Sequence, residues 1–201
     1  IASCTTPGYV YVVSSQNNEV VTKIRVGNQP YGITYDPANG YIYVANRISS
    51  TISVIDPSTN QVVATIPVGH LPLGLTFING YLYVVNSGSN SVSILDPKTG
   101  KVIGTIKNVG DAPTRLIYDP ANGYIYVANY NSNSVSVVDP STNQVVANVS
   151  VGSGSSYIMY DPSNGYIYVT HPLAGTVSII ATNNTTTTTQ PSGGFPLIYI
   201  I

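Results

Sequence analysis

The acidic residues are the first candidates for chemistry in this sequence, because two carboxylates held close together can act as general acid and general base. An Asp that opens a turn accepts hydrogen bonds from backbone N–H groups two residues further on, so an Asp-Pro pair also has a complete structural explanation. We predict that the carboxylates that precede proline cap turns. These residues, six of the eight acids in the chain, are Asp36, Asp56, Asp96, Asp119, Asp139 and Asp161.

The two histidines stand at different positions of a repeated pattern: His171 aligns with three asparagines, and His70 aligns with unrelated polar residues. A metal site needs several His, Cys or carboxylate ligands close together, and neither histidine has such neighbours in the sequence. The sequence also has no glycine-rich phosphate loop and no nucleophile elbow. We therefore predict no catalytic, metal-binding or cofactor-binding residues, and a protein that is not an enzyme.

Three asparagines match the N-glycosylation pattern: Asn148, Asn183 and Asn184. Such matches arise by chance in a chain rich in Asn, Ser and Thr, so each one alone is a weak signal. Asn183 and Asn184 lie in a Thr-rich segment that we expect to be exposed. The sequence predicts glycans there, which would solubilise a surface with few charges.

A repeated element must position the Asp and His residues and Asn148. The Val-Gly pairs that end at Gly27, Gly69, Gly110 and Gly152 are spaced 42, 41 and 42 residues apart. Between them, the phrase from Asp36 to Asn46 recurs letter for letter at 119–129. A period of about 40–45 residues built from short strands is typical of one four-stranded blade per repeat, so the sequence predicts an all-β propeller with antiparallel blades.

Each repeat predicts four strands that are rich in Val, Ile, Tyr and Thr and end at turn signals. In the Asp-Pro-Ala-Asn-Gly turn, proline fixes φ and Asn-Gly tolerates positive φ, as a tight hairpin requires. Both faces of the strands are partly apolar, which favours sheets sandwiched between neighbouring blades. In the first complete copy we expect strands at Gly32–Tyr35, Tyr41–Asn46, Thr51–Ile55 and Gln61–Val68.

The repeats occupy residues 1–181 and predict about four to five blades. Unpaired strand edges invite pairing, so three arrangements follow. The first strands complete the last blade of a four-bladed ring, or five blades form with incomplete ends, or neighbouring chains complete each other. The expected boundaries are a half blade at 9–27, full repeats at 28–69, 70–110 and 111–152, and a partial blade at 153–181.

The composition changes after the repeats. Residues 182–194 are rich in Thr, Asn and Gly and predict a stalk or linker, and residues 195–201 are apolar and β-prone. The apolar end is compatible with the beginning of a membrane anchor, with a strand donated to an unfinished blade, or with a terminus docked on its own domain. The candidate residues for assembly or anchoring are Phe195, Leu197, Ile198, Tyr199, Ile200 and Ile201.

The charge composition excludes one class of partner. Only 7% of residues are charged and the net charge is −1, against a usual charged share of roughly 25%. Nucleic-acid binding needs a clustered Lys/Arg footprint, and the seven basic residues are scattered over the repeats. The single cysteine, Cys4, allows no internal disulfide.

The strand phrases resemble a known repeat family. They stand in a frame of Asp-Pro, Asn-Gly-Tyr and Val-Gly, and they are Tyr-Val-Ala-Asn at 43–46 and 126–129, Tyr-Val-Val-Asn at 83–86 and Tyr-Val-Thr-His at 168–171. From about Tyr9 to Ala181, this pattern resembles the YVTN β-propeller repeat family. The resemblance implies a secreted propeller, and such repeats are frequent in archaeal and bacterial surface-layer or cell-surface proteins.

Together, these features predict an extracellular structural or adhesive glycoprotein at a cell surface, which assembles into a filament or surface layer. Its expected partners are further copies or other surface proteins, with membrane contact only through a C-terminal anchor. The alternative is a secreted binding module that recognises a glycan, peptide or small ligand through the propeller face. Tyr-rich loops favour that alternative, because tyrosine rings can stack on sugars.

Overall fold

The computed structural model describes residues 7–182 and the backbone of residues 199–200. Within these residues every regular element is a strand, and the strands form four antiparallel four-stranded sheets and one two-stranded sheet. No helix in this part of the chain is long and apolar enough to span a membrane. The predicted all-β blade architecture is confirmed.

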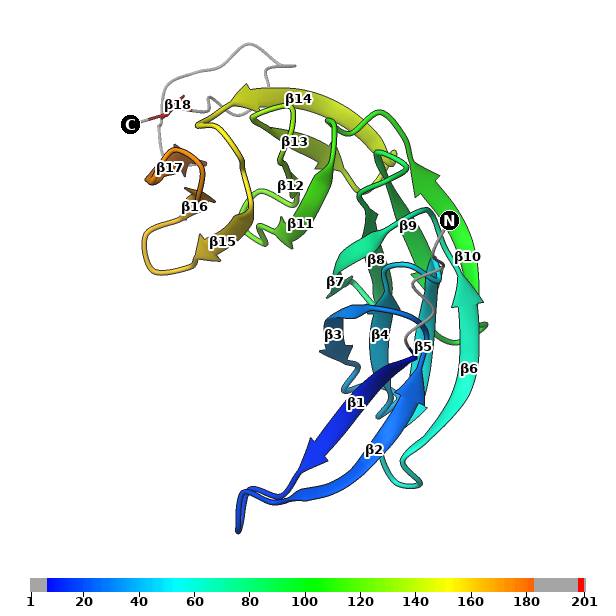
Figure 1. Cartoon of the computed structure of the whole chain (residues 1–201). Coiled ribbons are helices and arrows are strands. Elements are labelled where there is room, and N and C mark those ends of the chain that lie inside the picture. Colours follow the sequence, from blue (N-terminus) through cyan, green and yellow to red (C-terminus); the bar gives the residue numbers. More distant parts are fainter. Residues whose placement is uncertain (1–6, 183–198, 201) are drawn as a thin grey trace, which may run out of the picture. The chain divides into compact units, whose positions relative to one another are not determined.

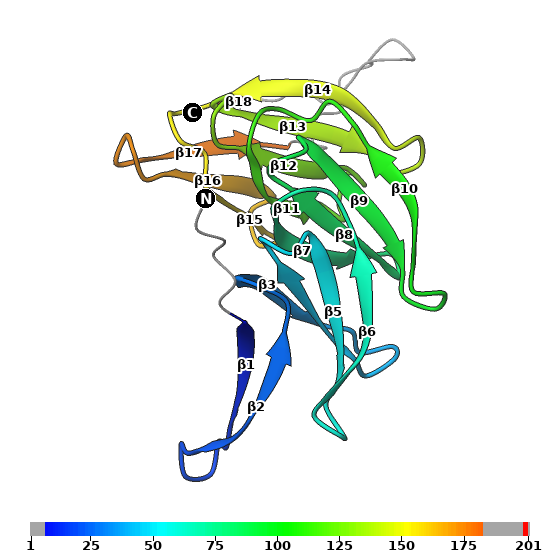
Figure 2. The same ribbon diagram turned by 45° about the vertical axis from the view of Figure 1, so that its right-hand side comes forward.

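The chain divides into two compact units, residues 1–106 and 107–201. The first unit contains a two-stranded sheet and two four-stranded blades (Figure 1). Figure 2 shows the blade β7–β10 with its strands side by side and β10 at one edge. The strands are β1 (Gly8–Val13), β2 (Val20–Val26), β3 (Pro30–Tyr35), β4 (Ile42–Asn46), β5 (Thr51–Asp56), β6 (Gln61–Pro67), β7 (Pro72–Ile78), β8 (Tyr81–Asn86), β9 (Ser91–Asp96) and β10 (Lys101–Ile106).

The second unit contains two more blades, each with its strands in chain order. Its last blade holds a short fourth strand, because β18 pairs with β17 through Ile180↔Ile200 and Ala181↔Tyr199. Counting from the repeats alone left this blade with three strands. The strands are β11 (Pro113–Tyr118), β12 (Ile125–Asn129), β13 (Ser134–Asp139), β14 (Gln144–Ser150), β15 (Tyr157–Asp161), β16 (Tyr166–His171), β17 (Thr176–Ala181) and β18 (Tyr199–Ile200).

The hairpin turns follow the predicted chemistry with one exception. Gly40 adopts a positive φ of 79°, and Asn60 adopts one of 56° at the following turn. Asn and Gly tolerate this left-handed region better than other residues do. The exception is the β7–β8 hairpin, where the repeat lacks Asp-Pro and the chain turns over Asn79 and Gly80 alone, with φ of 50° and 83°. Two positive φ values are what a two-residue hairpin of type I′ requires.

The core lies between the faces of adjacent blades. In the first unit, Tyr43 and Ile52 of one blade are buried against Leu82 and Leu95 of the next. The edge of the Tyr43 ring also meets Phe77, with the ring centroids 5.3 Å apart. Because the middle strands are covered on both faces, they are apolar on both faces, as predicted. Full burial of one such aliphatic side chain stabilises the fold by about 1.5–3 kcal/mol.

Candidate functional site

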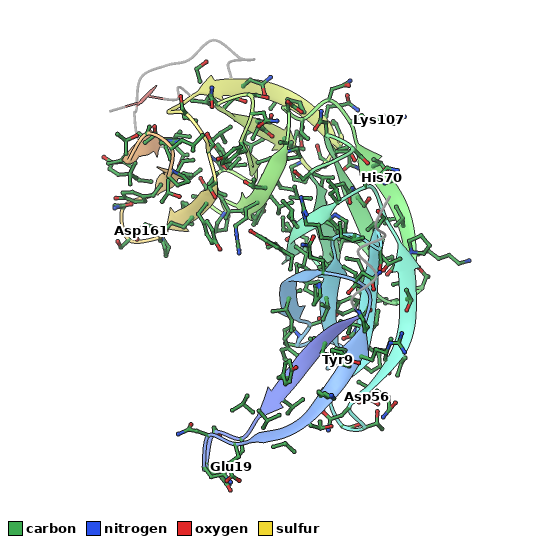
Figure 3. All side chains as sticks on the ribbon, in the orientation of Figure 1. Tyr9, Glu19, Asp56, His70, Lys107 and Asp161 are labelled. Atoms are coloured by element: carbon green, nitrogen blue, oxygen red, sulfur yellow. The ribbon has the colours of Figure 1, made fainter. Side chains whose placement is uncertain are left out.

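The Asp residues before proline cap turns, as predicted. In all six, Oδ1 accepts a hydrogen bond from the backbone N–H two residues further on, at 2.8–2.9 Å. The hydroxyl of Ser58 also donates to Asp56, and these bonds lower the pKa of that carboxyl; Ser163 acts in the same way on Asp161. Figure 3 shows Asp56 and Asp161 at the turns they cap. Stabilised as anions within their own turns, these carboxylates have a structural role.

The Asn-Gly-Tyr phrase forms a second repeated contact. Asn122 accepts a hydrogen bond from the backbone N–H of Tyr124 at 2.9 Å, and its Nδ2 donates to the hydroxyl of Tyr126 at 2.8 Å. Asn39 and Asn164 make the same pair of bonds in their own turns. Burial of Tyr126 raises the pKa of its hydroxyl to about 12. The phrase therefore fixes the turn to the strand that follows it.

A fully buried amide stands at the end of the second strand in three blades, at Asn46, Asn86 and Asn129. The Nδ2 of Asn86 donates to Ser91 at 3.3 Å and to Ser93 at 2.9 Å, and the other two amides bond their own blades in the same way. The Oδ1 atom of each has no hydrogen-bond partner among the described residues. A buried polar atom without a partner is costly, so this arrangement is tolerated for the packing it allows.

The glycine of each Val-Gly pair packs against this amide. A Cβ atom on Gly69 would lie 2.6 Å from Cγ of Asn86, and Gly27 and Gly110 face their own asparagines at the same distance. Carbon atoms in relaxed contact lie about 3.5–4.0 Å apart, so only glycine fits there. The glycine of the Val-Gly pair that defines the repeat therefore has a role in packing.

His171 replaces the amide in the fourth copy. It is 1% exposed, its Nε2 lies 2.9 Å from Ser178 Oγ, and a Cβ on Gly152 would lie 2.7 Å from its ring. Burial lowers the pKa of His171 below its ordinary value. His70, in contrast, is exposed in the loop before β7 (Figure 3), where its backbone N–H donates to Ser89 Oγ at 2.7 Å. Among the described residues, no three His, Cys, Asp or Glu side chains form a group that could hold a metal ion.

A buried carboxylate and a tyrosine meet between two blades of the second unit. Asp119 is fully buried and caps its own turn through Ala121. Burial, followed by the charge of Asp119, raises the pKa of the Tyr160 hydroxyl. The contact links the turn of one blade to the first strand of the next.

Arg115 and Tyr157 form a second pair between these blades. The guanidinium carbon lies 4.1 Å from the centroid of the tyrosine ring, and Nη2 donates to the hydroxyl at 3.2 Å. The equivalent residues in the first unit are Gly32 and Gly74, so this pair departs from the repeat. Tyr157 remains largely exposed, which leaves an aromatic ring and a cation available to a ligand.

One face of the blade β15–β18 is open. Tyr157 pairs with Thr170, and Thr170 pairs with Val177, so all three side chains lie on one face. Val177 is 55% exposed, whereas its counterparts in the three preceding blades are fully buried. Met159, two residues from Tyr157, is also exposed on this face. The buried counterparts of Val177 are Ile52, Val92 and Val135. We call this surface the open β15–β17 face.

A similar surface covers one side of β3. Tyr31, Ile33 and Tyr35 alternate along the strand, share one face and are all exposed. Ile33 is 56% exposed, whereas two of its counterparts, Leu116 and Ile158, are 3% and 6% exposed. We call this surface the open β3 face. It carries side chains of the kind that other blades bury against a neighbouring blade, but here they are exposed.

The structure describes three of the predicted site residues, all in the second unit. Asn148 lies exposed on the edge strand β14, and its Oδ1 accepts a hydrogen bond from Ser136 at 2.7 Å. Tyr199 and Ile200 form β18. The other candidates, Asn183, Asn184, Phe195, Leu197, Ile198 and Ile201, lie outside the described residues.

Sequence reasoning did not identify the buried amides or the open faces. The amides left a signal, because an Asn ends the strand phrase in three copies and each of these is followed by Ser-x-Ser or Thr-x-Ser, which supplies two hydroxyls. The open faces left none, because Val177 and its buried counterparts Ile52, Val92 and Val135 are all β-branched aliphatic residues. Only burial distinguishes it from them.

The family model described as lactonase, 7-bladed beta-propeller, matches residues 63–151 of this chain. No curated protein sequence matches it. Among solved structures, the chain is similar to hydrazine synthase of Kuenenia stuttgartiensis, with 23% identity and a TM-score of 0.71 over 96% of this chain and 55% of that one.

Two further structures share the fold. The WD40 β-propeller domain of Doa1 matches with 15% identity and a TM-score of 0.71, over 84% of this chain and 56% of that one. A protein of Desulfotomaculum acetoxidans DSM 771 described as functionally unknown matches with 16% identity and a TM-score of 0.67, over 82% and 55%. The chain thus spans about half the length of the structures it resembles, and the comparisons agree with the blades in assigning a β-propeller fold.

Proposed function

We propose that this chain is a non-enzymatic structural or adhesive β-propeller of the YVTN repeat type, which acts at a cell surface and associates through its open blade faces. The observation that carries the proposal is Val177, which is 55% exposed although its three counterparts are fully buried. A blade face that buries its apolar side chains in three copies and exposes them in the fourth is suited to receiving another blade. The expected partner is a further copy of the protein.

The chemistry of the polar groups supports a role without catalysis. The Asp side chains cap turns, Asn122 and its equivalents hold tyrosine hydroxyls, and Asn86 and its equivalents are buried against glycine. Each of these repeated side chains thus makes at least one hydrogen bond within its own blade. Because matched residues recur in every blade, they do not bring unlike groups together at one point, as acid–base catalysis requires.

The test is the mass of the native particle, measured by light scattering and electron microscopy. We expect assemblies larger than the chain mass of 21.2 kDa. A Val177→Lys variant should dissociate them, because it places a charge in the apolar contact. Ile103→Lys is the matched control, since Ile103 and its counterpart Val63 are both exposed within complete blades. A wild-type particle of single-chain mass, or equal effects of the two variants, would argue against assembly through this face.

A binding module for a glycan or peptide is the second candidate, and the Arg115–Tyr157 pair favours it. An exposed ring can stack on a sugar, and a guanidinium held at 4.1 Å from it keeps a planar set of donors for a carboxylate. A glycan and peptide array probed with wild type and Tyr157→Ala tests this function. Binding that the variant loses would support it, and no binding by the wild type would oppose it.

The lactonase match and the hydrazine synthase similarity define the enzymatic alternative. A lactone hydrolysis assay, performed with and without added divalent cations, addresses it directly. We expect no turnover above the uncatalysed rate in either condition. Turnover would replace the structural proposal with an enzymatic one.

A further inference from the structure

The sequence contains four Asn-Gly pairs, at Asn39, Asn79, Asn122 and Asn164. An Asn followed by Gly is prone to deamidation, because glycine has no side chain to hinder attack by its backbone nitrogen on the Asn side chain. All four pairs are followed by Tyr and stand at the same hairpin of their repeats. Differences in their reactivity must therefore come mainly from the fold.

Three of the pairs are held by hydrogen bonds at every reacting group. In the turn of Asn122, Oδ1 accepts from the backbone of Tyr124 and Nδ2 donates to Tyr126. The attacking nitrogen, that of Gly123, donates to the carbonyl of Asp119 at 2.8 Å. Asn39 and Asn164 have the same three bonds in their own turns. The nucleophile and the leaving amide are both engaged.

Asn79 differs in each of these respects. Its repeat lacks the Asp-Pro that begins the longer turn, so no Asp carbonyl accepts from the nitrogen of Gly80. Neither the Asn79 side chain nor the Gly80 nitrogen has a hydrogen bond within the described part of the chain. Both residues are exposed at the tip of the β7–β8 hairpin.

We infer that, of the four Asn-Gly pairs, Asn79-Gly80 is the one that undergoes spontaneous deamidation in the folded protein, and that the other three are protected by their turns. The backbone nitrogen of Gly80 forms a bond to Cγ of Asn79 and loses its proton, while the side-chain amide leaves as ammonia. Water then opens the resulting succinimide ring at either carbonyl, giving Asp or isoaspartate. No oxidation or reduction occurs in either step.

The product changes the hairpin in two ways. A negative charge appears at the blade tip of a chain whose net charge is only −1. Isoaspartate also adds a methylene group to the backbone at a two-residue turn whose flanking residues, Ile78 and Tyr81, pair with each other. A two-residue hairpin does not tolerate an added backbone atom without loss of that pairing. The modification therefore accumulates with the age of the molecule, and it weakens strand pairing at the β7–β8 hairpin of one blade.

The experiment is peptide mapping by mass spectrometry after incubation of the folded protein in mildly alkaline buffer. Each hydrogen bond that must open slows the reaction several-fold, so we expect Asn79 to react more than about tenfold faster than each of the other three. In denaturant the four pairs should react at similar rates. A matched variant, Tyr126→Phe, should raise the rate at Asn122 and leave Asn79 unchanged.

Two results would overturn the inference. In one, Asn79 reacts no faster than Asn39, Asn122 and Asn164 in the folded protein. In the other, the advantage of Asn79 persists in denaturant, which would assign it to the neighbouring residues in the sequence and not to the turn. Isoaspartate methylation by a methyltransferase supplies an independent readout of the site.

Discussion

A single methyl group on Gly69 should test the role of the Val-Gly pair. The added Cβ of Gly69→Ala would lie 2.6 Å from Cγ of Asn86, about 1 Å closer than a relaxed carbon–carbon contact. Gly69 does not adopt a positive φ, so alanine meets no backbone strain there. The cost must come from displacement of the buried amide.

The magnitude follows from that displacement. Overpacking a core costs about 1–3 kcal/mol, and the shift also stretches the 2.9 Å bond from Asn86 to Ser93, which is worth about 1 kcal/mol. Replacing glycine by alanine also stabilises the folded state by about 0.4–1 kcal/mol, because alanine restricts the conformations of the unfolded chain. We expect a net loss of about 2–3 kcal/mol. For a chain of this length, 1 kcal/mol corresponds to about 2–4 °C in Tm, so Tm should fall by roughly 4–12 °C.

Gly104→Ala is the matched control in the same unit. Gly104 lies in β10, where Ala64 and Ala147 occupy the equivalent positions of other blades. The atoms nearest to its added Cβ would all belong to the Ile94 side chain, the closest being Cδ1 at 3.4 Å. The same substitution should therefore stabilise the protein by about 0.4–1 kcal/mol.

Thermal and urea unfolding of the wild type and both variants, followed by circular dichroism, measure these effects. The two chemically identical substitutions should change the free energy of unfolding in opposite directions. A Gly69→Ala variant as stable as the wild type, or a Gly104→Ala variant destabilised to the same extent, would refute the packing role of the Val-Gly pair.

Two further predictions concern pH. Because burial lowers the pKa of His171 in the folded state, unfolding binds a proton below about pH 6.5, and the stability present above that pH is lost as pH falls toward the lowered pKa. In His171→Asn, which restores the amide of the other blades, Tm measured from about pH 8 to about pH 5 should fall less, and an equal fall would contradict this origin. The pKa of Tyr126 is raised to about 12, so stability should decline as pH rises from about 10 toward 12. Tyr126→Phe should remove that contribution and cost about 1 kcal/mol near neutrality through the lost bond to Asn122, as urea unfolding at both pH values would show.

Much of the fold could be predicted from the sequence, because the pattern of each strand occurs several times along the chain. The expected strand Thr51–Ile55 extends by one residue in the structure, and Gln61–Val68 ends one residue earlier. The Asp-Pro turns and the burial of both strand faces were also predictable, since a turn and its flanking alternation are local properties. The short turn at Asn79 could also be predicted, because its repeat has two residues fewer than the others between the first and second strands.

The candidate site could be predicted only in part. The Arg115–Tyr157 pair joins residues 42 positions apart, and the sequence shows only that both depart from glycine in the other copies. The contact of Gly69 with Asn86 likewise depends on how one blade follows the next. Neither contact has a local pattern, so neither could be read before the strands were placed.

The sequence by itself determined the low charge, which is a property of the composition. It also determined the repeat, the order of strands and the turn types, because these depend on residues that are neighbours in the chain. The tertiary structure decided which of several identical residues are buried. Val177 and Val135 have the same side chain and the same place in the repeat, yet one is 55% exposed and the other fully buried. Burial is set by what packs against a face, and this depends on contacts with strands outside the repeat unit itself.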